Sequence, residues 1–463
     1  MNFENETEKP RAGNNPSKLN TMTRRFLFVI FGIFLTGIAA QAQDWVHTGT
    51  NLGVDKIRIA ATDFKANGGD PQTATLKHTF DLTLYSDLEN AGIFDLVSKS
   101  FNPQERPGAP QEIHLAQWSA DPTLAAMVTF GSLGVQGNRV SVYGYLFDAK
   151  NAGSPQVLGK QYSEDATQDN ARAIAHKFAD EIIFRLGGGI PGIAESKIYY
   201  VCTRGGSKQI FAMDYDGQNQ HQLTSMAGPA ISPHVSPDNS RVAFSVLGSH
   251  GWTLSMYSLD LNRQVAFQSP GGSSISPSWS ADGRTLLFSS SRSGDPEIYS
   301  SDATGGNLHR LTQYAGPDVS PVFNPKTDAQ IAWISGRTSL PQLYIMDADG
   351  SNVQRMTDMG YATSPSWAPN GEFITFAWNR KYGPGDPGGQ DIYIMDVASK
   401  RWIQLTHQEG RNDFPSWSPD GRHIVYESQR GSSTSIWSML SDGTRPQQLT
   451  HSGSCSMPNW SWK

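Results

Sequence analysis

Carboxylates recur at one position of a repeated segment in this chain, and carboxylates at a fixed spacing could hold a metal ion. The recurring residues are Asp214, Asp260, Asp302, Asp347 and Asp396. Each of them lies beside a turn signal, and aspartate favours turns because its side chain hydrogen-bonds the neighbouring backbone. We therefore interpret these aspartates as structural turn residues and predict no metal site.

An aromatic residue recurs in the same segments, and a row of exposed rings could stack against sugars or nucleobases. The aromatic residues are Trp279, Phe323, Trp367, Trp417 and Trp460. One large ring per repeat also suits packing between neighbouring repeats, because a single repeat cannot bury its apolar face alone. We expect these rings to pack between repeats rather than to form a binding platform.

Catalytic motifs are missing from the sequence. It holds no Gly-x-Ser-x-Gly element, no His-x-x-x-His or His-Glu-x-x-His pair, no Cys-x-x-Cys pair and no glycine-rich phosphate loop. The formal net charge of −6 argues against a nucleic-acid partner, which would require a basic surface. We therefore predict a non-enzymatic protein with no cofactor and no nucleic-acid partner.

One phrase recurs through the last part of the chain and indicates its architecture. It reads SPSWSADGRTLLFS from Ser276 and SPSWAPNGEFITFA from Ser364, and its prolines stand at 233, 277, 321, 365, 415 and 458. The steps between these prolines are 44, 44, 44, 50 and 43 residues, a period typical of propeller blades. Each unit holds four predicted strands, with a hairpin turn after the first. The repeats therefore predict a six-bladed β-propeller over residues 197–463.

The two ends of the repeat region predict how the ring closes. The last unit has only one strand, SMPNWSWK from Ser456, and its three missing strands are predicted at 198–201, 210–214 and 221–224. One blade shared between the two ends would leave no exposed sheet edge. Alignment of the units places Cys202 and Cys455 nearly opposite each other in that blade. We expect either a disulfide between them or two free buried thiols.

Residues 43–186 have a different pattern, which predicts a two-layer α/β domain in front of the propeller. Strands are predicted at 57–64, 94–97, 125–133, 139–148 and 156–163, and helices at 76–90 and 169–186. Apolar residues at helical spacing indicate the helices, and glycines suited to a helix end follow both of them. Residues 187–196 are the predicted linker.

The first 42 residues have the pattern of a leader and signal peptide. Two arginines at 24–25 precede an apolar run over 26–39, and a small-x-small cleavage site ends at Ala42. The run is short for a membrane span. We expect translation to start at Met1 or Met22, cleavage after Ala42, and export of a mature chain that has no membrane span.

Polar side chains in front of the Ser-Pro phrases are predicted to gather at one mouth of the central channel. Repeat proteins usually bind partners through loops on one face. Solvated loops without a partner are the alternative for each residue. An insertion over 381–389 is predicted to be a flexible flap. The candidate residues are Ser273, Ser274, Asp318, Tyr361, Asn412 and Asp413.

Together these features resemble the TolB family of periplasmic β-propellers in the Tol-Pal system. The propeller part of the resemblance rests on the Ser-Pro-x-Trp-Ser-Pro-Asp-Gly phrases and on the Tyr-x-Met-Asp-x-Asp-Gly phrase over 344–350. The N-terminal part rests on DLENAGIF over 87–94 and on QEI over 111–113 with Trp118. The match covers nearly the whole expected mature chain.

The resemblance implies a periplasmic, non-enzymatic protein that supports outer-membrane integrity and constriction at cell division. It implies binding of a Pal-like peptidoglycan-associated lipoprotein through one propeller face, including residues 273–276, Val319 and Ser320. It also implies that a TolA-like inner-membrane protein contacts the N-terminal segment 43–53, which contains Asp44, Trp45 and Val46. An exported propeller enzyme and a glycan-binding module remain the alternatives.

Overall fold

The computed structural model describes residues 55–379, 389–407 and 409–462. The chain divides into two compact units, residues 1–46 and 47–463, and all described residues belong to the second. The expected signal peptide, its cleavage site, the N-terminal segment 43–53 and all but the last residue of the insertion lie outside the described residues. Within the described ranges, no helix is both long enough and apolar enough to span a bilayer.

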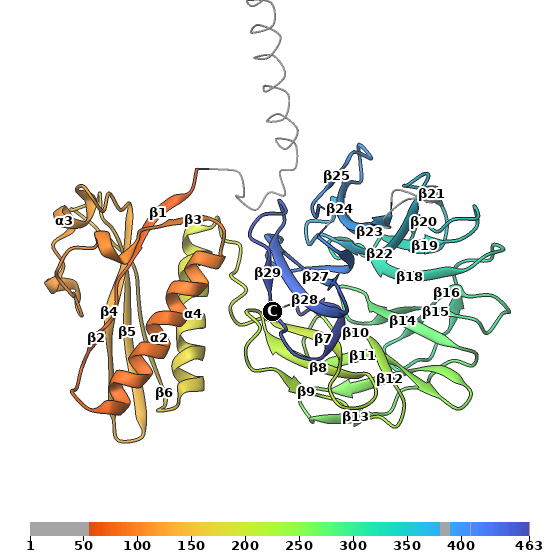
Figure 1. The fold of residues 1–463 in the computed structure, drawn as a ribbon, viewed down its shortest axis with the longest axis horizontal. Coiled ribbons are helices and arrows are strands. Elements are labelled where there is room, and N and C mark those ends of the chain that lie inside the picture. Colours follow the sequence, from red (N-terminus) through yellow and green to blue (C-terminus); the bar gives the residue numbers. More distant parts are fainter. Residues whose placement is uncertain (1–54, 380–388, 408, 463) are drawn as a thin grey trace, which may run out of the picture. The chain divides into compact units, whose positions relative to one another are not determined.

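The N-terminal part folds as a mixed sheet with two long helices on one face (Figure 1). Its strand order is β3-β1-β4-β5-β6, and β2 pairs with β4. The strands are β1 (Ile57–Ala61), β2 (Lys65–Ala66), β3 (Phe94–Leu96), β4 (Met127–Gln136), β5 (Arg139–Asp148) and β6 (Gln156–Asp165). The helices are α2 (Pro71–Asn90), α3 (Leu115–Ser119) and α4 (Gln168–Leu186). The chain therefore has the α/β region that the sequence predicts.

Local signals explain where the two long helices begin. The Asp70 carboxylate accepts a hydrogen bond from the Thr73 amide at 2.8 Å, and proline follows at the first helical position. This cap starts α2 five residues before the predicted start at residue 76. The Thr167 hydroxyl accepts from the Asn170 amide at 3.1 Å and starts α4 in the same way. The buried faces of both helices pack on the sheet in one apolar cluster.

The C-terminal part consists of antiparallel sheets whose strands follow one another in sequence. Three of these sheets have four strands each. The first holds β10 (Ala230–Val235), β11 (Arg241–Gly248), β12 (Gly251–Ser258) and β13 (Arg263–Val265). The second holds β14 (Ser274–Trp279), β15 (Thr285–Ser290), β16 (Glu297–Asp302) and β17 (His309–Arg310). The third holds β18 (Asp318–Phe323), β19 (Gln330–Ser335), β20 (Gln342–Asp347) and β21 (Gln354–Arg355).

The next sheet has eight strands, but it repeats the same four-strand order twice. Its first half holds β22 (Tyr361–Trp367), β23 (Phe373–Asn379), β24 (Gln390–Asp396) and β25 (Trp402–Gln404). Its second half holds β26 (Arg411–Trp417), β27 (His423–Arg430), β28 (Ser433–Leu440) and β29 (Gln447–Gln448). A single parallel residue pair, Gln390 with Arg411, joins the two halves.

The remaining sheet combines the last strand of the chain with three early ones. Its order is β30 (Ser454–Trp460), β7 (Lys197–Thr203), β8 (Gln209–Asp214) and β9 (His221–Gln222). Strands β30 and β7 are antiparallel, with Cys455 opposite Cys202 and Trp460 opposite Ile198. The two cysteines form a disulfide in the structure.

The first strand of each propeller group has the same irregularity at its repeated proline. In every group the pairing register shifts around the residue before the proline and the proline itself. Each residue before the proline has φ between 50° and 55°, the left-handed region that side chains disfavour. Such a bulge bends a strand and redirects its side chains. The six residues are Ser232, Ser276, Ser320, Ser364, Phe414 and Met457.

One recurring aspartate, Asp302, and one recurring aromatic residue, Trp279, have clear structural roles. Asp302 Oδ1 accepts hydrogen bonds from the backbone amides of Thr304 at 2.9 Å and Gly306 at 3.0 Å, which fixes a turn. Trp279 packs between one sheet and the next, in a cluster that joins Ala243 to Leu286. Within the described ranges, no group of three or more His, Cys, Asp or Glu side chains could hold a metal ion.

Candidate functional site

The first strand of each propeller group lines a central channel, which has two cavities along it. One cavity lies near the first residues of these strands, and we call it the start vestibule. The other lies near their last residues, and we call it the end vestibule. Their volumes are about 110 Å³ and about 200 Å³. Six side chains line both cavities and form the waist between them. They are His234, Ser278, Val322, Ser366, Ser416 and Asn459.

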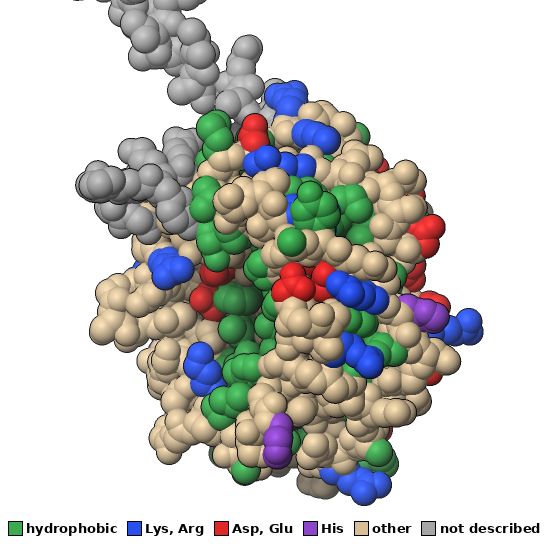
Figure 2. Space-filling model, turned by 90° about the vertical axis from the view of Figure 1, so that its right-hand side faces the viewer, with side chains coloured by type: hydrophobic (Ala, Val, Ile, Leu, Met, Phe, Trp, Pro, Cys, Tyr) green, Lys and Arg blue, Asp and Glu red, His purple; other side chains and the backbone are tan. Residues whose placement is uncertain are grey.

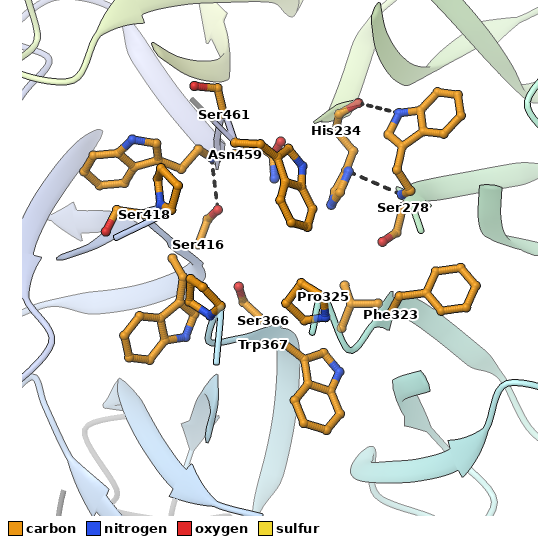
Figure 3. Close-up of a pocket in the computed structure, with 17 residues that line it drawn as sticks. His234, Ser278, Phe323, Pro325, Ser366, Trp367, Ser416, Ser418, Asn459 and Ser461 are labelled. Atoms are coloured by element: carbon orange, nitrogen blue, oxygen red, sulfur yellow. Dashed lines mark hydrogen bonds between the residues drawn. The ribbon is translucent and has the colours of Figure 1, made fainter. Parts of the chain in front are cut away.

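Waist side chains bond one group of strands to the next. Asn459 Oδ1 accepts a hydrogen bond from the Val235 amide at 2.9 Å, and the Ser416 hydroxyl accepts from the Trp460 amide at 3.0 Å. Strands β10 and β30 are edge strands of their sheets, so the amides of alternate residues face away from the paired strand and need another acceptor. Figure 3 shows that the labelled waist side chains come from successive strands around one central space.

We expect Asn459→Ala to destabilise the protein by about 1–2 kcal/mol, because the Val235 amide loses its acceptor. Urea unfolding measures this free energy. Ser278→Ala is the matched control at the same waist. Within the described residues, the Ser278 hydroxyl makes no hydrogen bond that the substitution would remove. Equal costs for the two variants would contradict the assignment of Asn459 as a bond between the two sheets.

Aromatic side chains form much of the lining of the end vestibule, but most of their surface is buried in the surrounding core. Trp279, Trp367, Trp417 and Trp460 are each at most 6% exposed, so their faces are not open to a ligand. His234 also lines it, and burial lowers the pKa of this imidazole to about 4. His234 Nδ1 accepts from the Trp279 amide at 3.4 Å. The imidazole is therefore neutral and serves as an acceptor between sheets.

The start vestibule is amphipathic. Four serines before the prolines place side chains along one arc of its lining, and Phe414 and Met457 form the other arc. The Ser232 hydroxyl lies 3.8 Å from the Met457 sulfur, which closes the ring between the two arcs. The cavity thus offers both hydroxyl groups and a small apolar surface. This combination suits an inserted protein segment better than a charged small molecule.

Two carboxyl groups lie beside the apolar arc. Asp413 and Glu427 are opposite each other on β26 and β27. Asp413 Oδ1 accepts from the Phe414 amide at 2.8 Å, and Glu427 Oε2 accepts from the Met457 amide at 2.9 Å. Burial and the charge of Asp413 raise the pKa of Glu427 to about 7, and burial raises the pKa of Asp413. The pair therefore favours holding a proton near neutral pH.

A raised carboxyl pKa makes the folded state bind protons more tightly than the unfolded state. Between about pH 4.5 and about pH 7, the free energy of unfolding should fall as pH rises, because the unfolded chain has released the proton that the folded protein still holds. We expect Glu427→Gln to reduce this fall by about 1–2 kcal/mol. Urea unfolding at several pH values measures it. The Glu427→Gln variant should retain a smaller slope, because burial also raises the pKa of Asp180 to about 7. A variant whose stability depends on pH as steeply as that of the wild type would contradict the expectation.

The structure separates the sequence-predicted mouth residues into two classes. Ser274, Asp318 and Asn412 have no exposed surface, so their side chains are not available to a partner. Asp318 pairs with Arg337 at 3.1 Å, and Asn412 donates to Thr406 at 3.1 Å. These positions lie at or near the starts of the inner strands, where their side chains are buried. Their polarity serves buried hydrogen bonds, which a sequence pattern cannot distinguish from a binding loop.

The remaining predicted residues keep some surface. Ser273, Val319, Tyr361 and Asp413 are partly exposed. Asp44, Trp45 and Val46 lie outside the described residues. Of the residues directly before and after each proline, which line the channel, the sequence-based prediction included only Ser276 and Ser320. The recurring Ser-Pro pair was the available signal, but only the bulge shows that it points to the channel.

Charge on the surface is mixed. Figure 2 shows one face of the molecule on which hydrophobic side chains gather through the middle, with acidic and basic groups beside them and no continuous basic area. Large exposed apolar areas mark interaction sites more often than scattered single residues do.

A family model described as "TolB beta propeller domain" matches residues 185–384 and 360–463. A "Protein TolB homolog" of Chlorobium chlorochromatii is 33% identical over 200 residues, 43% of this chain and 44% of that protein. A "Tol-Pal system protein TolB" of Desulfosudis oleivorans is 33% identical over 300 residues, 64% of this chain and 66% of that protein. The matched parts thus span from under half to about two thirds of these relatives.

Solved structures give the fold over a larger part of the chain. The crystal structure of TolB from Acinetobacter baumannii has a TM-score of 0.74 and 23% sequence identity. The match covers 88% of this chain and 97% of that one. At this identity the likeness supports the fold, an α/β region followed by a propeller.

Proposed function

The chain belongs to the TolB β-propeller family, and we propose from this premise that it is a periplasmic, non-enzymatic binding scaffold of the Tol-Pal system. In this proposal it links a Pal-like outer-membrane lipoprotein to a TolA-like inner-membrane protein. The linkage would support outer-membrane integrity and constriction at cell division. The relative named "Tol-Pal system protein TolB" supports the assignment to that system.

We propose that the propeller has six blades, with the eight-stranded sheet counted as two. Its two halves share one residue pair, whereas neighbouring strands within each half pair over several residues. The β30–β7 sheet would then be the shared blade that closes the ring. Closure supports the scaffold role, because it holds the six inner strands around one channel without a free edge.

The start vestibule is the proposed Pal-binding mouth, and its amphipathic lining is the observation that carries this assignment. Four serines and the pair Phe414 and Met457 give hydrogen-bonding and apolar surface in one cavity. Ser273, Val319, Tyr361 and Asp413 remain proposed contacts at its edge, since each retains surface. The N-terminal segment 43–53 is the proposed contact for the TolA-like protein, by family resemblance alone.

Binding of the Pal-like lipoprotein domain from the same genome tests this function. Isothermal titration with the full-length mature protein should give a saturable, micromolar or tighter interaction. Phe414→Ser should weaken it, because the variant removes half of the apolar arc of the vestibule. No binding by a folded wild-type protein would contradict the proposal, and glycan binding in its place would favour the alternative module.

A further inference from the structure

Three apolar side chains are exposed on loops at the end of the propeller where the inner strands begin. Met359 is 76% exposed, Tyr314 is 57% exposed and Leu340 is 37% exposed. Tyr314 precedes β18, Leu340 lies between β19 and β20, and Met359 precedes β22. Antiparallel pairing of β18 with β19 and of β19 with β20 places these loops at one end. We call the three residues the apolar rim.

Packed side chains below the rim hold it in place. The Arg337 guanidinium lies 4.9 Å from the ring centroid of Tyr314 and 4.9 Å from that of Tyr344. The same guanidinium pairs with the fully buried carboxylate of Asp318 at 3.1 Å. A cation stacked between aromatic rings and tied to a buried anion has little freedom to move. Tyr314 is therefore presented on a fixed support.

Met359 is held in an unfavourable backbone conformation. Its φ is 53°, a region in which any residue with a Cβ atom is strained and glycine is not. Its carbonyl accepts a hydrogen bond from Trp378 Nε1 at 3.3 Å, and the next carbonyl, of Gly360, accepts from Gln342 Nε2 at 3.0 Å. These bonds fix the loop through the backbone alone. The fold therefore does not require a large apolar side chain at this position.

A strained backbone that presents an exposed apolar side chain indicates a role outside the fold. The rim is continuous with the start vestibule along the chain. From Tyr314 the chain enters β18 and reaches Ser320 of the vestibule, and from Met359 it enters β22 and reaches Ser364. A protein domain seated over the vestibule would therefore meet the rim on this side.

We propose that the apolar rim is a second contact area for the Pal-like domain, one that receives an apolar part of a folded protein surface. This inference rests on the proposed function. The occupant is a protein rather than an anionic membrane, because the net charge of −6 gives the chain no general attraction to anionic lipid. The rim would fix the orientation of the partner, since it occupies only one side of the channel.

Met359→Gly separates this role from any role in folding. Glycine relieves the strained φ, so the thermal midpoint should stay the same or rise. The dissociation constant for the Pal-like domain should rise roughly fivefold or more. Val353→Ser is the matched control, because Val353 is 43% exposed on the turn between β20 and β21 at the other end of the sheet.

The outcomes distinguish this inference from the function on which it rests. A wild-type protein that binds, with Met359→Gly binding equally well, would overturn the rim alone. Equal weakening by Val353→Ser would also overturn it. A wild-type protein that does not bind the Pal-like domain would overturn both proposals. Binding of the wild type to anionic phosphatidylglycerol vesicles that Met359→Gly abolishes would assign the rim to a membrane instead.

Discussion

Removing residues 454–463 is expected to leave a chain that does not fold to a stable propeller. The deletion removes β30, the inner strand, which pairs with β7 in the sheet β30-β7-β8-β9. It also removes Trp460, which is 3% exposed and donates from Nε1 to the Ser196 hydroxyl at 2.8 Å. The remaining sheet would expose a long unpaired edge of β7, which invites aggregation. Circular dichroism and size-exclusion chromatography of the purified variant measure the outcome.

A smaller change at the same strand should give a graded effect. Trp460→Ala leaves the strand in place but removes a buried ring, and we expect a loss of about 3–5 kcal/mol in the free energy of unfolding. Deletion of Lys463 alone is the control, because it shortens the chain without removing any residue of β30. A deletion variant of 454–463 with wild-type stability would contradict the role assigned to β30.

Loss of the disulfide between Cys202 and Cys455 should cost up to about 5 kcal/mol of stability. The two residues are 253 apart in sequence, so the bond restricts a very long loop of the unfolded chain. Both side chains have no exposed surface, so the Cys202→Ala, Cys455→Ala double variant is preferable to serine, whose hydroxyl would be buried. Urea unfolding of the oxidised wild type and the double variant measures the difference.

Mass spectrometry under non-reducing conditions supplies the control for this prediction. The wild-type protein should lack two free thiols. Reduction of the unfolded wild type should bring its stability to that of the double variant. Two free thiols in the native protein, or equal stability of the oxidised and double-variant proteins, would contradict the proposed cross-link of the closing blade.

Sequence periodicity predicted much of the fold because each propeller unit carries its own turn chemistry. The threonine of each Leu-Thr or Met-Thr pair illustrates why the repeat can be recognised in the sequence. The Thr312 hydroxyl accepts from the Ile298 amide at 2.9 Å, and Thr406 accepts from Ile392 in the same way at 3.0 Å. A structural bond that is made in successive units leaves the same residues at the same spacing. The opposition of Cys202 and Cys455 followed from aligning these units.

The candidate site was harder to predict, because burial at a channel depends on the bulge at each Ser-Pro pair. Ser274 and Ser276 are two residues apart on one strand, yet the first is fully buried and the second lines the start vestibule. A regular strand would have turned both to the same side. The left-handed φ of Ser276 changes that alternation. Nothing in the types of these serines distinguishes their positions.

Contacts between distant segments also exceeded what local patterns indicate. The exposure of Met359 depends on the Trp378 and Gln342 side chains that fix its loop. The support under Tyr314 depends on Arg337, which stands in another loop. Propensity and spacing describe one segment at a time. Only the packed structure reveals which loops share an end of the propeller.

Hydrogen exchange of the protein with and without the Pal-like domain tests whether this partner covers the apolar rim and the start vestibule. We expect slower exchange over residues 313–320 and 356–364, which hold two of the three rim residues and lead into the start vestibule. We expect no change over residues 348–353, the turn between β20 and β21 at the opposite end. Protection confined to that opposite end, or no protection at saturating partner, would show that the Pal-like domain does not bind over the start vestibule.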